Sequence, residues 1–178
     1  PYFWLSGSAH PAADDYAYAR EARDMGYAAA NEHWFETRNS RFGATAILTL
    51  HPLIHGGLDT YQLIPYLWIG LLFLGFLALI HAATRQFLPV RQRMVATLSC
   101  TALTLYQLPN LAEGIYWMPG AVTYIVPGAV LLVYCALVVG WVRKTWLIHR
   151  WIHLAAMFLL MVLLFGFSEI IVLYLVAL

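Results

Sequence analysis

Charged residues are scarce in this sequence. Only 19 of its 178 residues are Asp, Glu, Lys or Arg, which is 11% of the chain, whereas a soluble domain carries about 25%. Hydrophobic residues make up 62%, and the mean hydropathy is +0.69. A disordered chain needs many charges and few apolar residues, so this composition excludes disorder and argues against a soluble domain.

Cysteine is also scarce, with only Cys100 and Cys135, and both lie in apolar stretches. Two isolated cysteines form neither a metal motif nor a disulfide framework.

The net charge is +1, and no run of Lys or Arg provides the basic patch that nucleic-acid binding requires. The sequence therefore predicts no nucleic-acid partner.

The chain lacks an initiating methionine and a signal-peptide pattern, and residues 170–178 end it within an apolar run. We expect it to be an N-terminal fragment of a longer membrane protein, with an unknown number of further helices.

Long apolar runs fill most of the sequence. A membrane-spanning helix needs about 20 mostly apolar residues, because the hydrocarbon core is about 30 Å thick. Four segments satisfy this length, so the predicted fold is all-α, a polytopic transmembrane helical bundle over residues 61–178. The predicted spans are 61–84, 94–112, 119–142 and 151–178.

Residues 1–60 are expected to form an external first loop. Within it, residues 12–37 favour one or two juxtamembrane helices, with Asp14 as a candidate N-cap. Residues 44–58 are apolar but too short to span, and they contain Pro52 and two glycines. This pattern predicts a re-entrant or interfacial piece.

The charges predict the orientation. Outside the first 43 residues, all six bases fall between the first two or the last two predicted spans, and positive loops stay cytoplasmic. The three acids of this region, Asp59, Glu113 and Glu169, then fall at the outer face. Because acids within apolar sequence are costly and usually functional, Glu113 and Glu169 are candidate site residues.

Residues 1–10 are typical of the end of an apolar membrane segment whose start we expect before Pro1. Asp14 and Asp15 follow it at the start of the external segment and are therefore the main catalytic candidates. Two adjacent carboxylates can provide a general base, a metal ligand or both. They are also typical of the first turn of a helix, where they interact favourably with the helix dipole. Spacing alone leaves these interpretations open.

Three motifs together suggest a family. Asp14-Asp15-Tyr16 is followed by a Trp-containing segment that ends in Asn-Ser-Arg-Phe at 39–42, and Glu-Gly-Ile-Tyr-Trp-Met-Pro-Gly at 113–120 joins two spans. This pattern resembles the GT-C superfamily of polytopic membrane glycosyltransferases. It is most similar to bacterial members that resemble O-antigen glucosyltransferases, although Ser40 stands where a glycine is typical.

The resemblance implies an enzyme of the cell envelope in the bacterial inner (plasma) membrane. It would move a sugar from a polyprenyl-phosphate donor to an acceptor on the outer side. Asp14 or Asp15 would act as general base or help hold a divalent metal. Arg41 would bind the lipid phosphate with two aligned donors, or else form a structural ion pair. Tyr116 and Trp117 would stack on the sugar or isoprenoid, or else belong to an interfacial aromatic belt.

Other functions stay open. The chain could be a non-catalytic accessory or scaffold subunit of a larger membrane complex, or a transporter with helices broken at Pro109 and Pro127. Two histidine pairs, His51 with His55 and His149 with His153, are spaced to share a helix face and could begin a metal or haem site.

Overall fold

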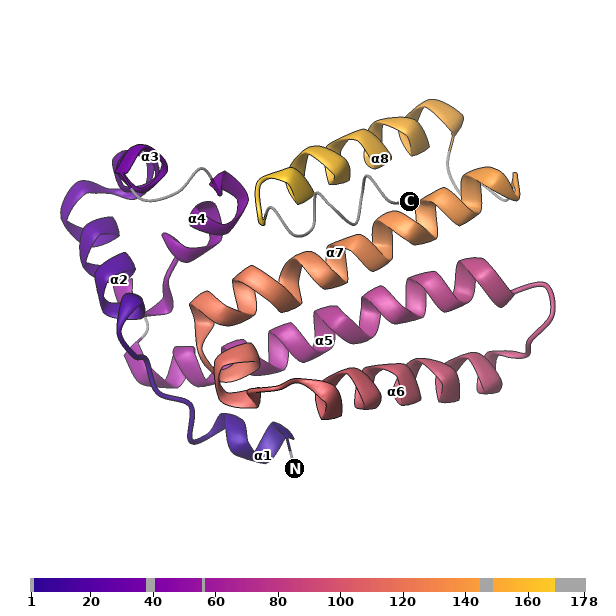
Figure 1. The fold of residues 1–178 in the computed structure, drawn as a ribbon, viewed down its shortest axis with the longest axis horizontal. Helices are drawn as coiled ribbons and strands as arrows, with labels where there is room; N and C mark the ends of the chain where they lie inside the picture. Colours follow the sequence, from indigo (N-terminus) through magenta and orange to yellow (C-terminus); the bar gives the residue numbers. More distant parts are fainter. Residues whose placement is uncertain (1, 38–40, 56, 145–148, 169–178) are drawn as a thin grey trace.

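The computed structural model describes residues 2–37, 41–55, 57–144 and 149–168. Every regular element within these ranges is a helix, so the all-α prediction is confirmed. Figure 1 shows an elongated bundle with a group of shorter helices at one end.

Two long apolar helices form the centre of the bundle. These are α5 (Gly57–Thr84) and α7 (Met118–Val142), which match the predicted spans 61–84 and 119–142. They pack side by side more extensively than any other pair of described elements. At Gly75 the backbones come so close that a Cβ atom would lie 2.9 Å from the carbonyl oxygen of Ala129. Both helices are long and apolar enough to cross a membrane.

The flanking helices are α6 (Val90–Gln107), which packs on α5, and α8 (Arg150–Phe165), which packs on α7. The prediction of a helix over 94–112 is wrong at its C-terminal end, since α6 stops after Gln107. Leu108 has extended backbone because it precedes Pro109, and a residue before proline is disfavoured in α conformation.

The predicted span 151–178 is also not continuous. Helix α8 ends at Phe165, and the carbonyl oxygen of Gly166 accepts hydrogen bonds from the backbone of Gly43 and Ala44, at 2.8 and 3.3 Å. These two N–H groups open another helix and have no partner within it. Helix α8 therefore ends where it meets the start of α4, and Glu169 lies outside the described residues.

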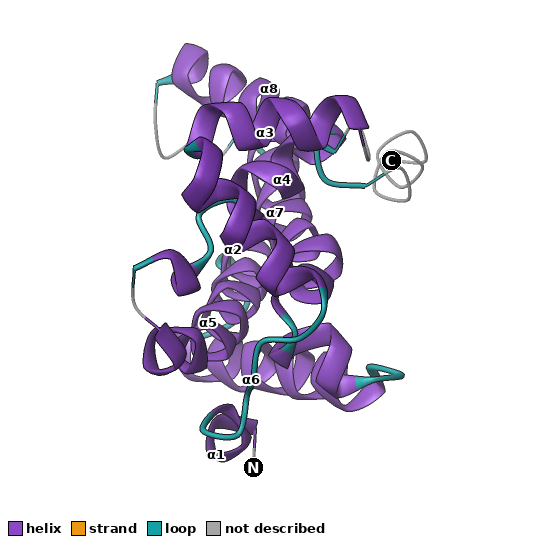
Figure 2. Ribbon diagram, turned by 90° about the vertical axis from the view of Figure 1, so that its left-hand side faces the viewer, coloured by secondary structure: helices purple, strands orange, loops and turns teal. Residues whose placement is uncertain are grey.

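The N-terminal helices cover one end of the bundle. Figure 2 looks onto this end and shows α2, α3 and α4 lying across it. The predicted segment 12–37 is indeed two helices, separated at Gly26, where φ is +80°. Their faces meet where Tyr18 stacks on Trp34, with ring centroids 4.1 Å apart. In chain order the elements are α1 (Tyr2–Ser6), α2 (Asp14–Met25), α3 (Tyr27–Thr37), α4 (Phe42–Leu48) and the 3-10 turn η1 (Pro52–Ile54).

Two details of this end differ from the sequence predictions. Ala13, with φ of 45°, is the N-cap of α2, and Asp14 is instead the first helical residue. Residues 44–58 are divided among α4, η1 and the start of α5. The first two are too short to span, in keeping with the prediction for that segment, whereas α5 begins before the predicted boundary at residue 60.

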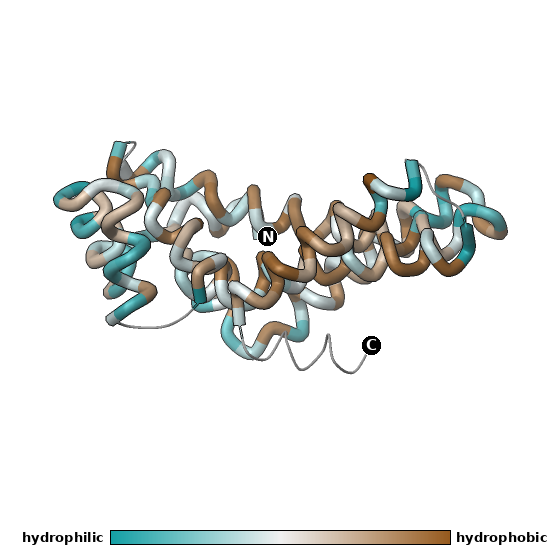
Figure 3. Tube along the Cα trace, turned by 90° about the horizontal axis from the view of Figure 1, so that it is seen from above, coloured by the Kyte–Doolittle hydropathy of each residue, from teal (hydrophilic) through white to brown (hydrophobic). Residues whose placement is uncertain are grey.

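The helices α5, α6, α7 and α8 alternate in direction (Figure 1). As a result, the loops that carry the bases after α5 and after α7 share one end of the bundle, and Asp59 and Glu113 share the other. We call these the base end and the acid end. The tube in Figure 3 is brown along its middle and teal mainly toward the two ends, so the polar residues flank an apolar centre.

Candidate functional site

The acid end contains a buried carboxylate. Asp15 lies in the first turn of α2 and has no exposed surface. Its Oδ2 accepts hydrogen bonds from the backbone N–H of Ala12 and the hydroxyl of Tyr61, each at 2.9 Å. Its Oδ1 lies 2.9 Å from Nε2 of His51. Three donors from three parts of the chain therefore surround this carboxylate.

The surroundings of His51 indicate which ring nitrogen carries the proton. Its Nδ1 accepts a hydrogen bond from the backbone N–H of Leu53 at 3.2 Å, so Nδ1 has no proton. The proton then lies on Nε2, which donates to Asp15. Both side chains are fully buried. This arrangement ties the loop before η1 to the start of α2.

Tyr61 extends the network into the bundle. It lies near the start of α5, and its oxygen accepts a hydrogen bond from the backbone N–H of Met118 at 3.2 Å. Its hydroxyl donates to Asp15, with the carbonyl of Tyr116 as a second acceptor at 3.2 Å. Asp15, His51 and Tyr61, which we call the buried triad, thus join α2, the η1 loop, α5 and the start of α7. A network with all its polar groups paired holds its members rigidly.

Asp14 has the opposite environment. Its side chain is exposed, and it forms no hydrogen bond or ion pair with the residues that the structure describes. Consecutive helical residues point about 100° apart, so one member of the pair faces inward and the other outward. The triad fixes the backbone turn that carries both. Asp14 is consequently an available carboxylate at a fixed position.

A shallow pocket of about 490 Å³ lies beside this turn. One side is formed by the loop after α1 and the other by η2 (Ala112–Tyr116), a π-helical turn that joins α6 to α7. The lining residues are Ser8, Ala9, His10, Ala12, Ala112, Glu113, Tyr116 and Trp117.

The two aromatic residues hold the walls of the pocket together. The Tyr116 hydroxyl donates to the carbonyl of Tyr2 at 2.7 Å, and Nε1 of Trp117 donates to the carbonyl of Ala12 at 3.2 Å. Burial, together with the nearby Tyr2 and Tyr66 hydroxyls, raises the pKa of Tyr116. The phenol therefore stays protonated and keeps donating in this bond.

Close packing shapes η2. A Cβ atom on Gly120 would overlap the carbonyl oxygen of Glu113, so a larger residue would displace this turn. The carboxylate of Glu113 is exposed at the pocket. Glycine at position 120 thus lets α7 begin directly under the turn that carries Glu113.

The structure brings together some of the predicted site residues. Glu113, Tyr116 and Trp117 share the pocket, and Ala12 links it to the turn that bears the acidic pair. Arg41 lies elsewhere, as the N-cap of α4, and does not line the pocket. Glu169 is outside the described residues.

Sequence reasoning missed the roles of His51 and Tyr61. His51 and His55 flank the 3-10 turn η1 as its N-cap and C-cap. The prediction that they share one face of an α-helix is therefore wrong. Of the second pair, His149 is the N-cap of α8 and His153 donates to the carbonyl of Leu137 at 2.9 Å. Within the described ranges, no group of three or more His, Cys, Asp or Glu side chains gathers that could hold a metal ion. The one signal for the triad was the presence of polar side chains at the borders of apolar runs.

Comparison of the chain with protein-family models, with curated proteins and with solved structures returned no match.

Proposed function

We propose that this chain is the N-terminal part of a membrane glycosyltransferase of the GT-C type, which uses a polyprenyl-phosphate sugar. The observation that supports this proposal best is the difference in environment between Asp14 and Asp15. One carboxylate is buried and fully hydrogen-bonded. The other is exposed and does not itself line the pocket, but it lies two residues after Ala12, which does. A general base must be both accessible and precisely positioned.

The proposed membrane placement follows from the charges. Helices α5 and α7 supply the apolar length, and the flanking helices would complete the bundle in the full protein. The base end would face the cytoplasm and the acid end the outer side, because Lys and Arg are retained on the cytoplasmic side. Sugar transfer would then occur at the outer face, where Asp14 and the pocket lie.

In the proposed reaction, the oxygen of an acceptor hydroxyl forms a bond to the anomeric carbon of the donor sugar. The bond between that carbon and the lipid phosphate oxygen breaks, and the phosphate leaves with the electron pair. Asp14 takes the hydroxyl proton as the new bond forms, because a hydroxyl is a poor nucleophile until its proton is removed. Asp15 is a positioning residue in this scheme.

Further residues have subsidiary roles. Tyr116 and Trp117 offer the apolar surface on which a sugar ring or an isoprenoid unit can pack. Glu113 would accept hydrogen bonds from sugar hydroxyls. Arg41 does not line the pocket, so a role in offsetting the phosphate charge with two parallel hydrogen bonds requires the donor lipid to reach from the pocket to the start of α4. Among the described residues, no group of three or more His, Cys, Asp or Glu side chains that could hold a metal ion lies around Asp14.

The test is sugar transfer by the full-length protein in nanodiscs. Asp14→Asn should lower turnover by about 10²–10⁴-fold, the usual contribution of general-base catalysis, with unchanged thermal stability. The matched control is Asp24→Asn, which alters another exposed acid on the same helix and should keep the wild-type rate.

Wild-type turnover in Asp14→Asn would contradict the proposed base. If, in addition, the full-length protein transferred no sugar from any polyprenyl-phosphate donor, the accessory-subunit alternative would become the better interpretation.

A further inference from the structure

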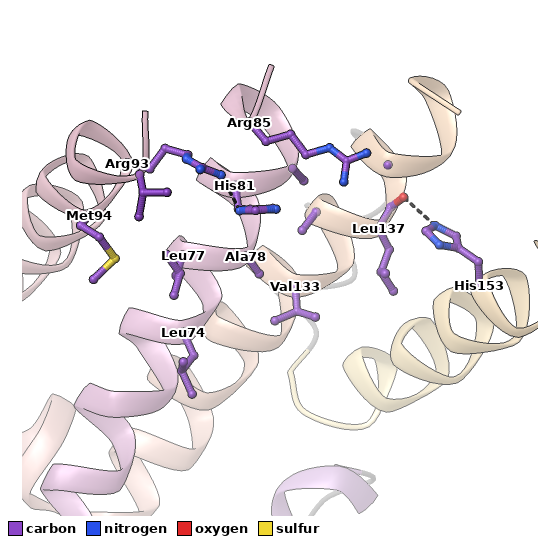
Figure 4. Close-up of a pocket in the computed structure, with 14 residues that line it drawn as sticks. Leu74, Leu77, Ala78, His81, Arg85, Arg93, Met94, Val133, Leu137 and His153 are labelled. Carbon is purple, nitrogen blue, oxygen red and sulfur yellow. Dashed lines mark hydrogen bonds between the residues drawn. The ribbon is translucent and has the colours of Figure 1, made fainter. Parts of the chain in front are cut away.

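A cavity lies far from the acidic pair, at the base end. Its volume is about 690 Å³, within the range of about 300–1,000 Å³ that is typical of small-molecule sites. Figure 4 shows side chains from α5, α6, α7 and α8 around it. Most of the wall is apolar, for example Leu74, Leu77, Met94 and Val133.

The polar groups of this cavity are bases. Arg85, Arg93 and His81 gather at one side of it, and Figure 4 shows them above the apolar wall. Nη1 of Arg93 donates to Nδ1 of His81 at 2.7 Å, so that ring accepts and carries its proton on Nε2. Nε of Arg93 is buried and has no hydrogen-bond partner among the described residues.

Among the described residues, no carboxylate pairs with the guanidinium of Arg93. Within residues 60–168, Glu113 is the only acid, and it lies at the opposite end of the bundle. Arg143, near the same end as Arg93, donates to a backbone carbonyl, that of Ala83. A guanidinium that is partly removed from water is stabilised by an anion. The cavity therefore combines an apolar wall with cationic donors that complement an anionic group.

We propose that this cavity binds an anionic phospholipid. Its phosphate would lie between Arg85 and Arg93, and one acyl chain would follow the apolar wall toward Leu74. Charge complementarity selects the headgroup, and the wall selects the chain, since an apolar surface of this size gains free energy only with an apolar occupant. Basic pockets between membrane helices on the cytoplasmic side bind acidic lipid headgroups in this way.

This site is independent of the proposed sugar transfer. It lies at the base end, whereas Asp14 and its pocket lie at the acid end. The predicted orientation would place the cavity in the cytoplasmic leaflet, where a resident phospholipid can enter between the helices.

The test is native mass spectrometry of the full-length protein in detergent, titrated with phosphatidylglycerol, phosphatidylcholine or inorganic phosphate. Phosphatidylglycerol should bind at least tenfold more tightly than phosphatidylcholine. Arg93→Gln and Arg85→Gln should each weaken this binding by roughly tenfold or more, because hydrogen bonds to charged groups are worth that much. Arg91→Gln removes an exposed base from the same helix as Arg93, outside the cavity, and should change little.

A steric variant keeps the test independent of charge. Ala78→Phe fills the cavity from α5 while every base remains, and it should also weaken phosphatidylglycerol binding. Circular dichroism identifies any variant that fails to fold, and the remaining variants then decide the outcome. Equal binding of the two lipids, equal losses in Arg91→Gln and Arg93→Gln, or full displacement of the lipid by an equal concentration of inorganic phosphate would each overturn the proposal.

Discussion

The two ends of the helical bundle differ in how completely their buried charged groups are hydrogen-bonded. At the acid end, Asp15 is fully buried and accepts three hydrogen bonds, among them one from His51 and one from Tyr61. At the base end, Arg93 contacts a histidine, its Nε has no partner among the described residues, and a cavity lies beside it.

This difference separates positioning from binding. A fully paired network has no capacity left for a ligand, so the buried triad can only hold the turn that presents Asp14. In the cavity of the base end, Nε of Arg93 has no partner among the described residues and is a donor that a ligand can satisfy. The acid end therefore provides a rigid platform with one exposed carboxylate, and the base end provides a place for an anion.

The largest stability effect should come from breaking the triad. Asp15→Ala leaves the His51 and Tyr61 donors buried without an acceptor, and removing one member of a buried pair costs about 3–5 kcal/mol. Chemical denaturation in detergent, followed by circular dichroism, measures the free energy of unfolding. Asp24→Ala on the same helix should stay within about 0.5 kcal/mol of wild type. Equal losses in the two variants would show that burial of Asp15 contributes nothing special.

A smaller effect is expected at the turn that carries Glu113. Gly120→Ala would force a Cβ atom into the carbonyl of Glu113, and such overpacking costs about 1–3 kcal/mol. Gly128→Ala in the same helix meets nothing within 4 Å and should instead stabilise by about 0.5–1 kcal/mol, because alanine is the better helix former. Thermal unfolding of both variants measures the contrast. Stabilisation by both changes would show that the contact with η2 is loose.

The smallest effect should occur at the base end. His81→Ala removes the acceptor of Nη1 of Arg93, but His81 is exposed, so water can replace it as the acceptor. The expected loss is about 0.5 kcal/mol, in the range of ordinary surface substitutions. The same denaturation series measures it beside Asp15→Ala. A loss as large as that of Asp15→Ala would end the contrast between the two ends.

Much of the fold was predictable from local sequence. The apolar runs at 61–84 and 119–142 are helices, as their length and composition predict. Residues 12–37, whose composition favours one or two helices, form two. The helix ends were less predictable. The end of α6 follows from the local restriction before Pro109, whereas the end of α8 depends on a contact between Gly166 and Gly43, more than 100 residues away in the chain.

The candidate site also combines features that local sequence sets with features that tertiary packing sets. The sequence by itself determined the acidic pair and the cluster Glu113, Tyr116 and Trp117. It also determined the separation of bases from acids outside the first 43 residues, because all these features depend on residue type and on position relative to apolar runs. Only the tertiary structure decided which aspartate of the pair is buried. That choice depends on His51 and Tyr61, which lie 36 and 46 residues from Asp15 and meet it only after the helices pack. A hydrogen bond needs donor and acceptor within about 3 Å, and packing alone sets such distances between remote segments.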